Sequence, residues 1–241
     1  MNFKSRKFRI AVVVSGVVLA GILFLVSPFF HVQEIIIQGN NRITNSDIEQ
    51  RLGVTRTDNI LLLNTSAARR RIMSNLYIGD VSFRRDLPGR LYVTVFERRP
   101  SAYVAHMGNF LVLDDFGRVL EIRSNHQETL PLLEGLHFTS SRLGEVLDVS
   151  NAVDFDSVVL YTQLLVVHGL IHDITHINVS DPANIRILIN YLEFHVGGPS
   201  DADEKVRAIV EVLNELPDAG RMRGFVDMRD TRAQFSLQLL Q

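Results

Sequence analysis

The sequence predicts an α+β protein in which an N-terminal transmembrane helix is followed by two extracytoplasmic domains. The first observation is an uncharged apolar stretch over residues 10–30, behind a basic tail of residues 1–9. The second is an order of turns and apolar periods in residues 31–99, which predicts a β-α-α-β-β domain. The third is a set of short strands and two helical patterns in residues 100–241. This pattern predicts a β-rich domain with two helices packed on a mainly antiparallel sheet.

The stretch from Ile10 to Phe30 is long enough for a helix that crosses a bilayer. Four basic residues precede it, so the positive-inside rule keeps the N-terminus in the cytoplasm and sends the rest of the chain across. The alternative is a cleaved signal peptide with a small-x-small site at Val18–Ala20. Cleavage there would leave Gly21–Phe30 as an exposed apolar tail, and we therefore expect an anchor. The basic residues are Lys4, Arg6, Lys7 and Arg9.

The composition limits the classes of function. The net charge is −2, with both signs interspersed, whereas a nucleic-acid-binding surface shows a basic stripe. The chain has no Cys, which excludes disulfides, Cys-ligated zinc, iron–sulfur clusters and thiol nucleophiles. The roughly 210 residues after the apolar stretch fit two domains of modest size.

The first domain is predicted from helix caps and turn residues. Thr44 is a candidate N-cap for a helix that ends at Gly53, and Asn64 or Thr65 is a candidate N-cap for a second helix that continues to Leu76. Because both helices lie between strands, they should cover one face of a small three-stranded sheet. The predicted strands are 32–38, 78–84 and 90–96.

A turn, an alternating strand and a charged stop follow one another in residues 84–102. Asp86–Gly89 has the composition of a turn, with Gly89 tolerating a positive φ. The strand after it alternates aliphatic and polar or aromatic positions, so one face should be buried. Glu97–Pro100 should end the pairing, because Pro cannot donate to a ladder and the charges cannot enter a core.

The second domain begins with a predicted hairpin, in which strands 110–113 and 118–121 flank a turn with a positive φ at Gly117. Residues 197–199, Gly-Gly-Pro, should interrupt the later strands. The last strand has one apolar and one neutral polar face. The remaining predicted elements are helices 154–167 and 205–216, and strands 172–179, 185–190, 191–196, 224–229 and 233–239.

One run of residues resembles a known family. The pattern P-x-x-L-x-V-x-V-x-E-R-x-P-x-A is similar to the end of the POTRA domain in FtsQ/DivIB, the bitopic division proteins of bacteria. Residues 32–40 and 43–48 resemble the opening strand and helix start of that domain. The D-x-x-G hairpin, the L-P-x-x-x-G run at 130–135 and V-D-M-R at 226–229 resemble segments beyond it. The pattern residues are Pro88, Leu91, Val93, Val95, Glu97, Arg98, Pro100 and Ala102.

The resemblance implies a non-enzymatic scaffold of the division machinery. Its members are single-pass proteins of the inner membrane at the division septum, with periplasmic C-terminal domains. They recruit the coiled-coil proteins FtsB and FtsL, or a DivIC-type partner, for septal peptidoglycan synthesis, and other divisome members bind the POTRA domain. A β-strand of FtsB augments the distal sheet near its last strands. Membrane-anchored sensors and secretion-pathway POTRA adaptors are the alternatives, although no barrel follows the POTRA pattern here.

Two surfaces are therefore expected to bind partners. The C-terminal strand lies at a sheet edge or needs another strand beside it, although it could also simply complete the sheet. Beyond Arg229 the match ends, because Asp230, Thr231 and Arg232 stand where some relatives place Tyr and Ser. The candidate partner-binding residues are Arg229, Asp230, Arg232, Ala233, Phe235 and Leu237 in the C-terminal region, and Arg84 and Arg85 on the POTRA edge.

Catalytic and metal signals are weak. His168, His172 and His176 have the spacing of one helix face, but Gly169 and the β-branched residues around them indicate that the helix stops first. The pairs Asp114-Asp115 and Asp154/Asp156 are explained by a turn and a helix N-terminus. No nucleophile elbow, P-loop, zincin motif or dinucleotide fingerprint occurs, so neither an enzyme nor a cofactor is expected. A ligand-sized pocket lined by His172, His176 and His195 would favour the sensor or an envelope hydrolase.

Overall fold

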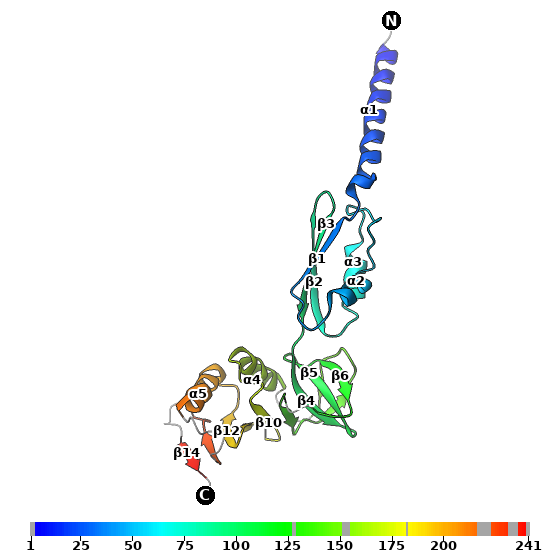
Figure 1. The fold of residues 1–241 in the computed structure, drawn as a ribbon. Helices are drawn as coiled ribbons and strands as arrows, with labels where there is room; N and C mark the ends of the chain where they lie inside the picture. The colour runs from blue at the N-terminus through cyan, green and yellow to red at the C-terminus, as the bar shows by residue number, and fades with distance from the viewer. Residues whose placement is uncertain are drawn as a thin grey trace. The chain divides into compact units, whose positions relative to one another are not determined.

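The computed structural model describes residues 3–126, 129–150, 155–181, 183–215, 223–230 and 236–239. It has the predicted α+β class, and the chain divides into two compact units, Met1–Glu97 and Arg98–Gln241. Each unit has its own hydrophobic core. Figure 1 shows the elements of both units.

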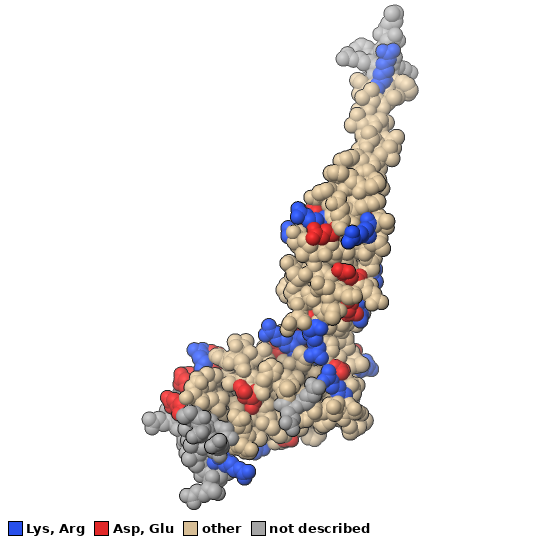
Figure 2. Space-filling model, in the orientation of Figure 1, with Lys and Arg blue, Asp and Glu red and all other residues tan. Residues whose placement is uncertain are grey.

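The first unit begins with helix α1 (Phe3–Leu25), which a short 3₁₀ turn, η1 (Pro28–Phe30), follows. The segment Phe8–Leu25 has a mean hydropathy of 2.5, and none of it is buried within the protein. On the face that Figure 2 shows, the described part of the helix has charged atoms near its N-terminal end and a long uncharged surface below them. Its length and apolar composition suffice to cross a membrane, as a single-pass protein requires.

The rest of this unit has the predicted β-α-α-β-β order. Strand β3 (Arg90–Glu97) lies in the centre of a three-stranded sheet, parallel to β1 (Glu34–Gln38) and antiparallel to β2 (Ile78–Asp86). Helices α2 (Asn45–Leu52) and α3 (Thr65–Ile72) pack on it. The inward side chains of all five elements form one core, which includes Ile48, Leu52, Ile72, Val81, Leu91, Val93 and Val95.

The helix caps are those that the sequence predicts. The Thr44 hydroxyl accepts a hydrogen bond from Asp47 N at 3.2 Å, and the Asn64 side chain accepts one from Ala67 N at 2.9 Å. The second helix, however, ends at Ile72 and not at Leu76. Asn75 ends it, because its backbone N–H bonds Ile72 O at 3.2 Å in a tighter turn and its side chain accepts from Tyr77 N at 3.0 Å.

Glu97 closes the first unit by a set of backbone hydrogen bonds. Its carboxylate accepts from the N–H groups of Asn41, Arg42 and Ile43 at 3.0, 2.8 and 2.8 Å. These three groups form the turn between β1 and α2, whereas Glu97 is the last residue of β3. A residue predicted only to stop a strand therefore joins the two ends of the domain.

The predicted role of Gly89 is wrong in one respect. Its backbone is not in the positive-φ region. A Cβ at this position would stand 2.6 Å from His31 O and 2.8 Å from Gln33 Cγ, so the absence of a side chain lets the β2–β3 turn approach the segment that enters β1.

Pro100 also differs from its prediction, because it begins a strand. β4 (Pro100–His106) pairs with β5 (Asn109–Asp114), and only Arg98 and Arg99 separate it from β3. Proline is tolerated at the first residue of a strand, where its missing N–H breaks no ladder bond. The sequence reasoning missed this strand because it treated proline as a stop.

The second unit is built on a nine-stranded sheet of order β14-β13-β12-β11-β10-β7-β4-β5-β6. Five of its eight pairings are antiparallel and three are parallel, which agrees with the predicted mainly antiparallel sheet. The strands not yet given are β6 (Val119–Arg123), β7 (Leu132–Glu134), β10 (Ile174–Asn178), β11 (Ile185–Ile189), β12 (Leu192–Gly197), β13 (Gly224–Asp227) and β14 (Ser236–Leu239). A separate small sheet pairs β8 (Phe138–Ser140) with β9 (Asp148–Val149).

Two helices pack on this sheet, as predicted. α4 (Phe155–Val167) and α5 (Ala202–Glu215) share a core with the inward residues of β11, β12 and β13. α5 begins three residues earlier than the predicted Lys205. The core includes Tyr161, Leu165, Val206 and Ile209 from the helices and Ile187, Phe194 and Val226 from the strands.

A buried ion pair supports the start of the second unit. Arg98 Nη1 lies 3.1 Å from Asp114 Oδ2, and the Asp114 side chain is fully buried. The other carboxylate oxygen accepts from Phe116 N at 3.0 Å and Arg118 N at 2.8 Å, which forms the predicted turn, with Gly117 at φ 74°. Removing one partner would leave an uncompensated buried charge, a loss that typically costs about 3–5 kcal/mol.

We expect Glu97→Gln to destabilise the turn between β1 and α2. The amide keeps one acceptor oxygen but turns an N–H₂ group towards backbone donors, and hydrogen bonds to a charged group contribute about 1.5–3 kcal/mol each. Hydrogen exchange should show loss of amide protection at residues 41–43. The control is Glu49→Gln, at an exposed position on α2. Unchanged protection in Glu97→Gln would contradict the role of the carboxylate.

Candidate functional site

The C-terminal strand lies at one edge of the nine-stranded sheet. β14 pairs antiparallel with β13, with Val226 opposite Leu237 and Asp227 opposite Ser236. Among the residues that the structure describes, no strand pairs with the outer side of β14. The backbone N–H and C=O groups on that side can therefore pair with an extended segment of another chain.

Arg229 forms a two-point ion pair with Asp227 directly after β13. Its Nε and Nη2 lie 2.9 and 2.5 Å from the two carboxylate oxygens of Asp227, and its backbone N–H donates to Oδ1 at 3.1 Å. The hydrogen bond from Arg229 lowers the pKa of Asp227 to about 2. The guanidinium stays half exposed, so Arg229 shapes the end of β13 and remains accessible to a partner.

Of the other candidate partner-binding residues in the C-terminal region, the structure describes two, Asp230 and Leu237. Asp230 is exposed at the end of the same segment. Leu237 lies in β14. Arg232, Ala233 and Phe235 lie outside the residues that the structure describes.

The sequence reasoning missed a polar and aromatic surface beside this edge. On the sheet face opposite α4 and α5, Arg186 Nη1 and His195 Nε2 lie 3.2 and 3.4 Å from Glu193 Oε1. The His195 and Phe225 rings stack with centroids 5.1 Å apart. The signal was present, because these residues occupy the polar positions of strands whose apolar positions are buried.

A buried network holds the end of β12. The Lys205 ammonium donates to Val196 O at 2.8 Å, and the Tyr161 hydroxyl donates to Gly198 O at 2.8 Å. Burial lowers the pKa of Lys205 and raises the pKa of Tyr161, because each charged form would lose its hydration. The network joins α4 and α5 to the strand next to β13 and so stabilises the sheet on which β14 depends.

Arg84 and Arg85 are exposed on β2, which is an edge strand of the first sheet. The Arg84 guanidinium lies 3.9 Å from the centre of the Tyr92 ring, and Arg85 Nη2 donates to Leu63 O at 2.8 Å. Both side chains are therefore oriented by the domain itself while their charge faces solvent.

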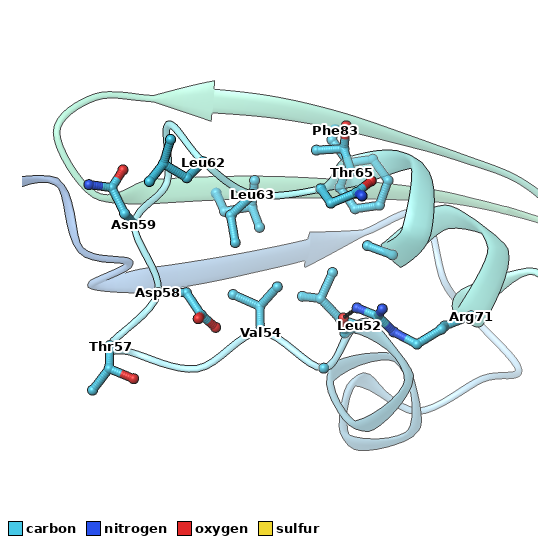
Figure 3. A pocket seen from close by; sticks show the side chains of 14 residues that line it. Leu52, Val54, Thr57, Asp58, Asn59, Leu62, Leu63, Thr65, Arg71 and Phe83 are labelled. Atoms are coloured by element: carbon cyan, nitrogen blue, oxygen red, sulfur yellow. Dashed lines mark hydrogen bonds between the residues drawn. The ribbon is translucent and has the colours of Figure 1, made fainter. Parts of the chain in front are cut away.

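The first unit also contains a pocket of about 360 Å³ between the α2–α3 loop and the sheet. Figure 3 shows Leu52, Val54 and Leu63 towards its interior. Arg71 Nε donates to Arg51 O at 3.0 Å, and Arg71 Nη2 donates to Leu52 O. The Arg71 guanidinium therefore caps the end of α2. The sequence reasoning assigned no role to this loop, whose signal was the Leu triplet at 61–63.

The three spaced histidines have separate partners. His168 Nε2 lies 3.2 Å from Asp203 Oδ1, His172 Nδ1 lies 2.9 Å from Thr129 O, and His176 Nε2 lies 3.8 Å from Glu134 Oε1. Within the described parts of the chain, no group of three or more His, Asp or Glu side chains could hold a metal ion. The helix stops at Val167, as the glycine at 169 predicts.

Comparison with known proteins shows similarity to a family of domains and to bacterial cell division proteins. Residues 30–98 match the model of the FtsQ-type POTRA domain. The chain is 23% identical over 203 residues to the cell division protein DivIB of Clostridium tetani, and the matched region covers 83% of this chain and 77% of that protein. It is 27% identical over 211 residues to DivIB of Clostridium acetobutylicum, with 86% and 82% covered. The structure of the major extracytoplasmic domain of DivIB from Geobacillus stearothermophilus aligns with a TM-score of 0.33 and 18% identity, over 51% of this chain and 97% of that one.

The Asp227–Arg229 pair should make the end of β13 sensitive to acid. The pKa of Asp227 is lowered from its usual 3.8 to about 2 in the folded protein, so the pair stabilises the fold fully above pH 4. This contribution is lost as the pH falls from about 4 to about 2. An NMR titration of the Asp227 carboxyl should give a midpoint near 2, and Arg229→Gln should raise that midpoint. A midpoint near 3.8 in the unsubstituted chain would contradict the pairing.

Proposed function

Because the chain belongs to the FtsQ/DivIB family of cell division proteins, we propose that it is a non-enzymatic scaffold that captures a coiled-coil division partner on its last strand. The partner is FtsB together with FtsL, or a DivIC-type protein in place of FtsB. An extended segment of FtsB pairs with β14 and adds a tenth strand to the sheet. Capture of this pair brings it to the septum for peptidoglycan synthesis.

The position of β14 at the sheet edge is the observation that carries this proposal. β-Addition needs a strand with free backbone groups and a rigid sheet behind it. The edge position of β14 supports the first condition. The second is supported because β13 and β12 are tied to the two helices through a shared core and the Lys205–Tyr161 network. The polar surface of Glu193, His195 and Phe225 lies on the same strands and is available for side chains of the partner.

The rest of the chain sets the location of this sheet. In the proposal, α1 anchors the protein in the inner membrane, residues 1–9 stay in the cytoplasm, and domains 31–99 and 100–241 are periplasmic at the division septum. The basic residues before the apolar segment support this direction of insertion. No catalytic step is required of any residue, since recruitment is a binding function.

Leu237→Pro should weaken the binding of FtsB. A proline removes a backbone donor from β14 and distorts the edge, and each lost ladder hydrogen bond contributes about 0.5–1.5 kcal/mol. Since 1.4 kcal/mol is a factor of ten in affinity, we expect a weakening of about tenfold or more. The measurement is titration of the full chain in detergent with the extracytoplasmic segments of FtsB and FtsL.

The matched control is Ile122→Pro, in β6 at the opposite edge of the same sheet, where the side chain is 47% exposed. This variant should bind FtsB as the unsubstituted chain does. Equal binding by Leu237→Pro and the unsubstituted chain, with the protection of β13 amides unchanged, would rule out capture on β14.

A second surface is proposed for other divisome members. β2 is an edge strand, and its exposed Arg84 and Arg85 suit a partner with an acidic extended segment. We expect the double variant Arg84→Glu/Arg85→Glu to lose co-purification of such members and to keep FtsB. Arg70→Glu, an exposed charge reversal on α3, is the control. Loss of FtsB together with all other partners would indicate unfolding, which hydrogen exchange of β2 and β3 detects.

A further inference from the structure

The α2–α3 loop is hydrogen-bonded to the end of α1 and to residues 30–32, which follow that helix. Leu25 is the last residue of α1, and its carbonyl oxygen accepts a hydrogen bond from Asn59 Nδ2 at 2.7 Å. Ile60 N donates to Phe30 O at 2.8 Å, and Val32 N donates to Asp58 O at 2.9 Å. The loop therefore cannot leave the base of the helix without breaking three hydrogen bonds.

The β2–β3 turn adjoins the same segment. Gln33 N donates to Gly89 O at 2.8 Å, and the missing side chain of Gly89 allows close contact with His31. Figure 3 shows Asn59 and Leu62 at the end of the domain where this turn lies, whereas Arg71 lies with the helices at the other end. We call residues 55–63 and 86–90 the membrane-proximal rim.

The position of the rim relative to a bilayer follows from the length of α1. The membrane-span candidate Phe8–Leu25, in which Arg9 is the one charged residue, has 18 residues and is about 27 Å long at 1.5 Å per residue. A hydrocarbon core is about 30 Å thick, so Leu25 O lies near its boundary when the helix spans it. A side chain hydrogen-bonded to Leu25 O then lies in the headgroup region.

The rim exposes large apolar side chains at this depth. Leu62 is 70% exposed and Leu87 is 52% exposed, while Phe29 at the base of the helix is 54% exposed. Phe29 stacks on Phe24 of α1, with ring centroids 5.7 Å apart, so the apolar surface of the helix continues towards the rim. Large apolar side chains exposed at the end of a domain that adjoins an apolar helix favour contact with the membrane interface.

The charges of the rim have mixed sign. Arg90 pairs with Asp86 at 3.1 Å, and Asp58 accepts hydrogen bonds from the backbone N–H and hydroxyl of Thr55 at 2.7 and 3.0 Å. Such a surface has no net attraction to anionic lipid, and its contribution to binding comes from apolar insertion.

We infer that the membrane-proximal rim lies in the bilayer interface, with Leu62 and Leu87 inserted among the lipid headgroups. This inference rests on the proposed retention of α1 as an anchor. The contact would hold the POTRA domain against the membrane at two further points, which restricts its tilt about the end of the helix and the orientation of β2 towards its partners.

Site-specific fluorescence can test the inference, because the chain has no Cys and a single introduced thiol is unique. The full chain is placed in phosphatidylcholine nanodiscs that contain phosphatidylcholine with a nitroxide at a shallow acyl position. Labels on Leu62→Cys and Leu87→Cys should be quenched by this lipid. A label on Phe96→Cys should not be, because this 55% exposed position lies about 20 Å further along β3 than Arg90.

A second substitution tests whether the two leucines act together. Adding Leu87→Asp to labelled Leu62→Cys should reduce the quenching, while adding Phe96→Asp should leave it unchanged. The inference is overturned when the labels at 62 and 87 are quenched no more than the label at 96, although a label on Val18→Cys is quenched by a deep acyl nitroxide. Absence of quenching at Val18 as well would instead overturn the proposed anchor, and the inference with it.

Discussion

The contacts of two adjacent charges, Glu97 and Arg98, hold the ends of both folded units. Glu97 accepts hydrogen bonds from three backbone N–H groups in the turn between β1 and α2, so the end of β3 is tied to the start of the helical segment. Arg98 neutralises the buried Asp114, whose second oxygen organises the first hairpin of the other unit. Hydrogen bonds to an ionised group are about twice as strong as those between neutral groups, so these contacts stabilise the end of one unit and the start of the other.

Two sheet edges are the proposed partner-binding surfaces of this protein. β14 ends the larger sheet and β2 ends the smaller one, and each carries or adjoins arginines that the protein itself orients. Orientation by Asp227 or Tyr92 lowers the conformational entropy that a partner has to remove on binding. The helices cover the apolar face of the larger sheet and leave the face of Glu193 and His195 polar, so strand addition at β14 can proceed without exposing the core.

Elements with strong local signals were predictable from sequence. Thr44 and Asn64 cap their helices as expected, because a side-chain acceptor three residues before a free N–H acts within one turn. The hairpin at Gly117 and both later helices were also predicted correctly. β4 was not, because the role of Pro100 depends on whether its missing N–H would face a neighbouring strand, and that neighbour is fixed only by the sheet.

The sequence by itself determined the order of segments: an apolar helix, a β-α-α-β-β domain and a mainly antiparallel domain with two helices. Periodicity and turn chemistry are local, so they can be recognised without knowing which segments meet. Only the tertiary structure decided that the Glu97 carboxylate accepts hydrogen bonds from the backbone amides of residues 41–43 and that the Asn59 side chain donates one to the end of α1. The same holds for the position of β14 at the edge of its sheet. Each of these joins residues distant in the chain, and the order of strands in a sheet depends on which apolar faces can be buried together.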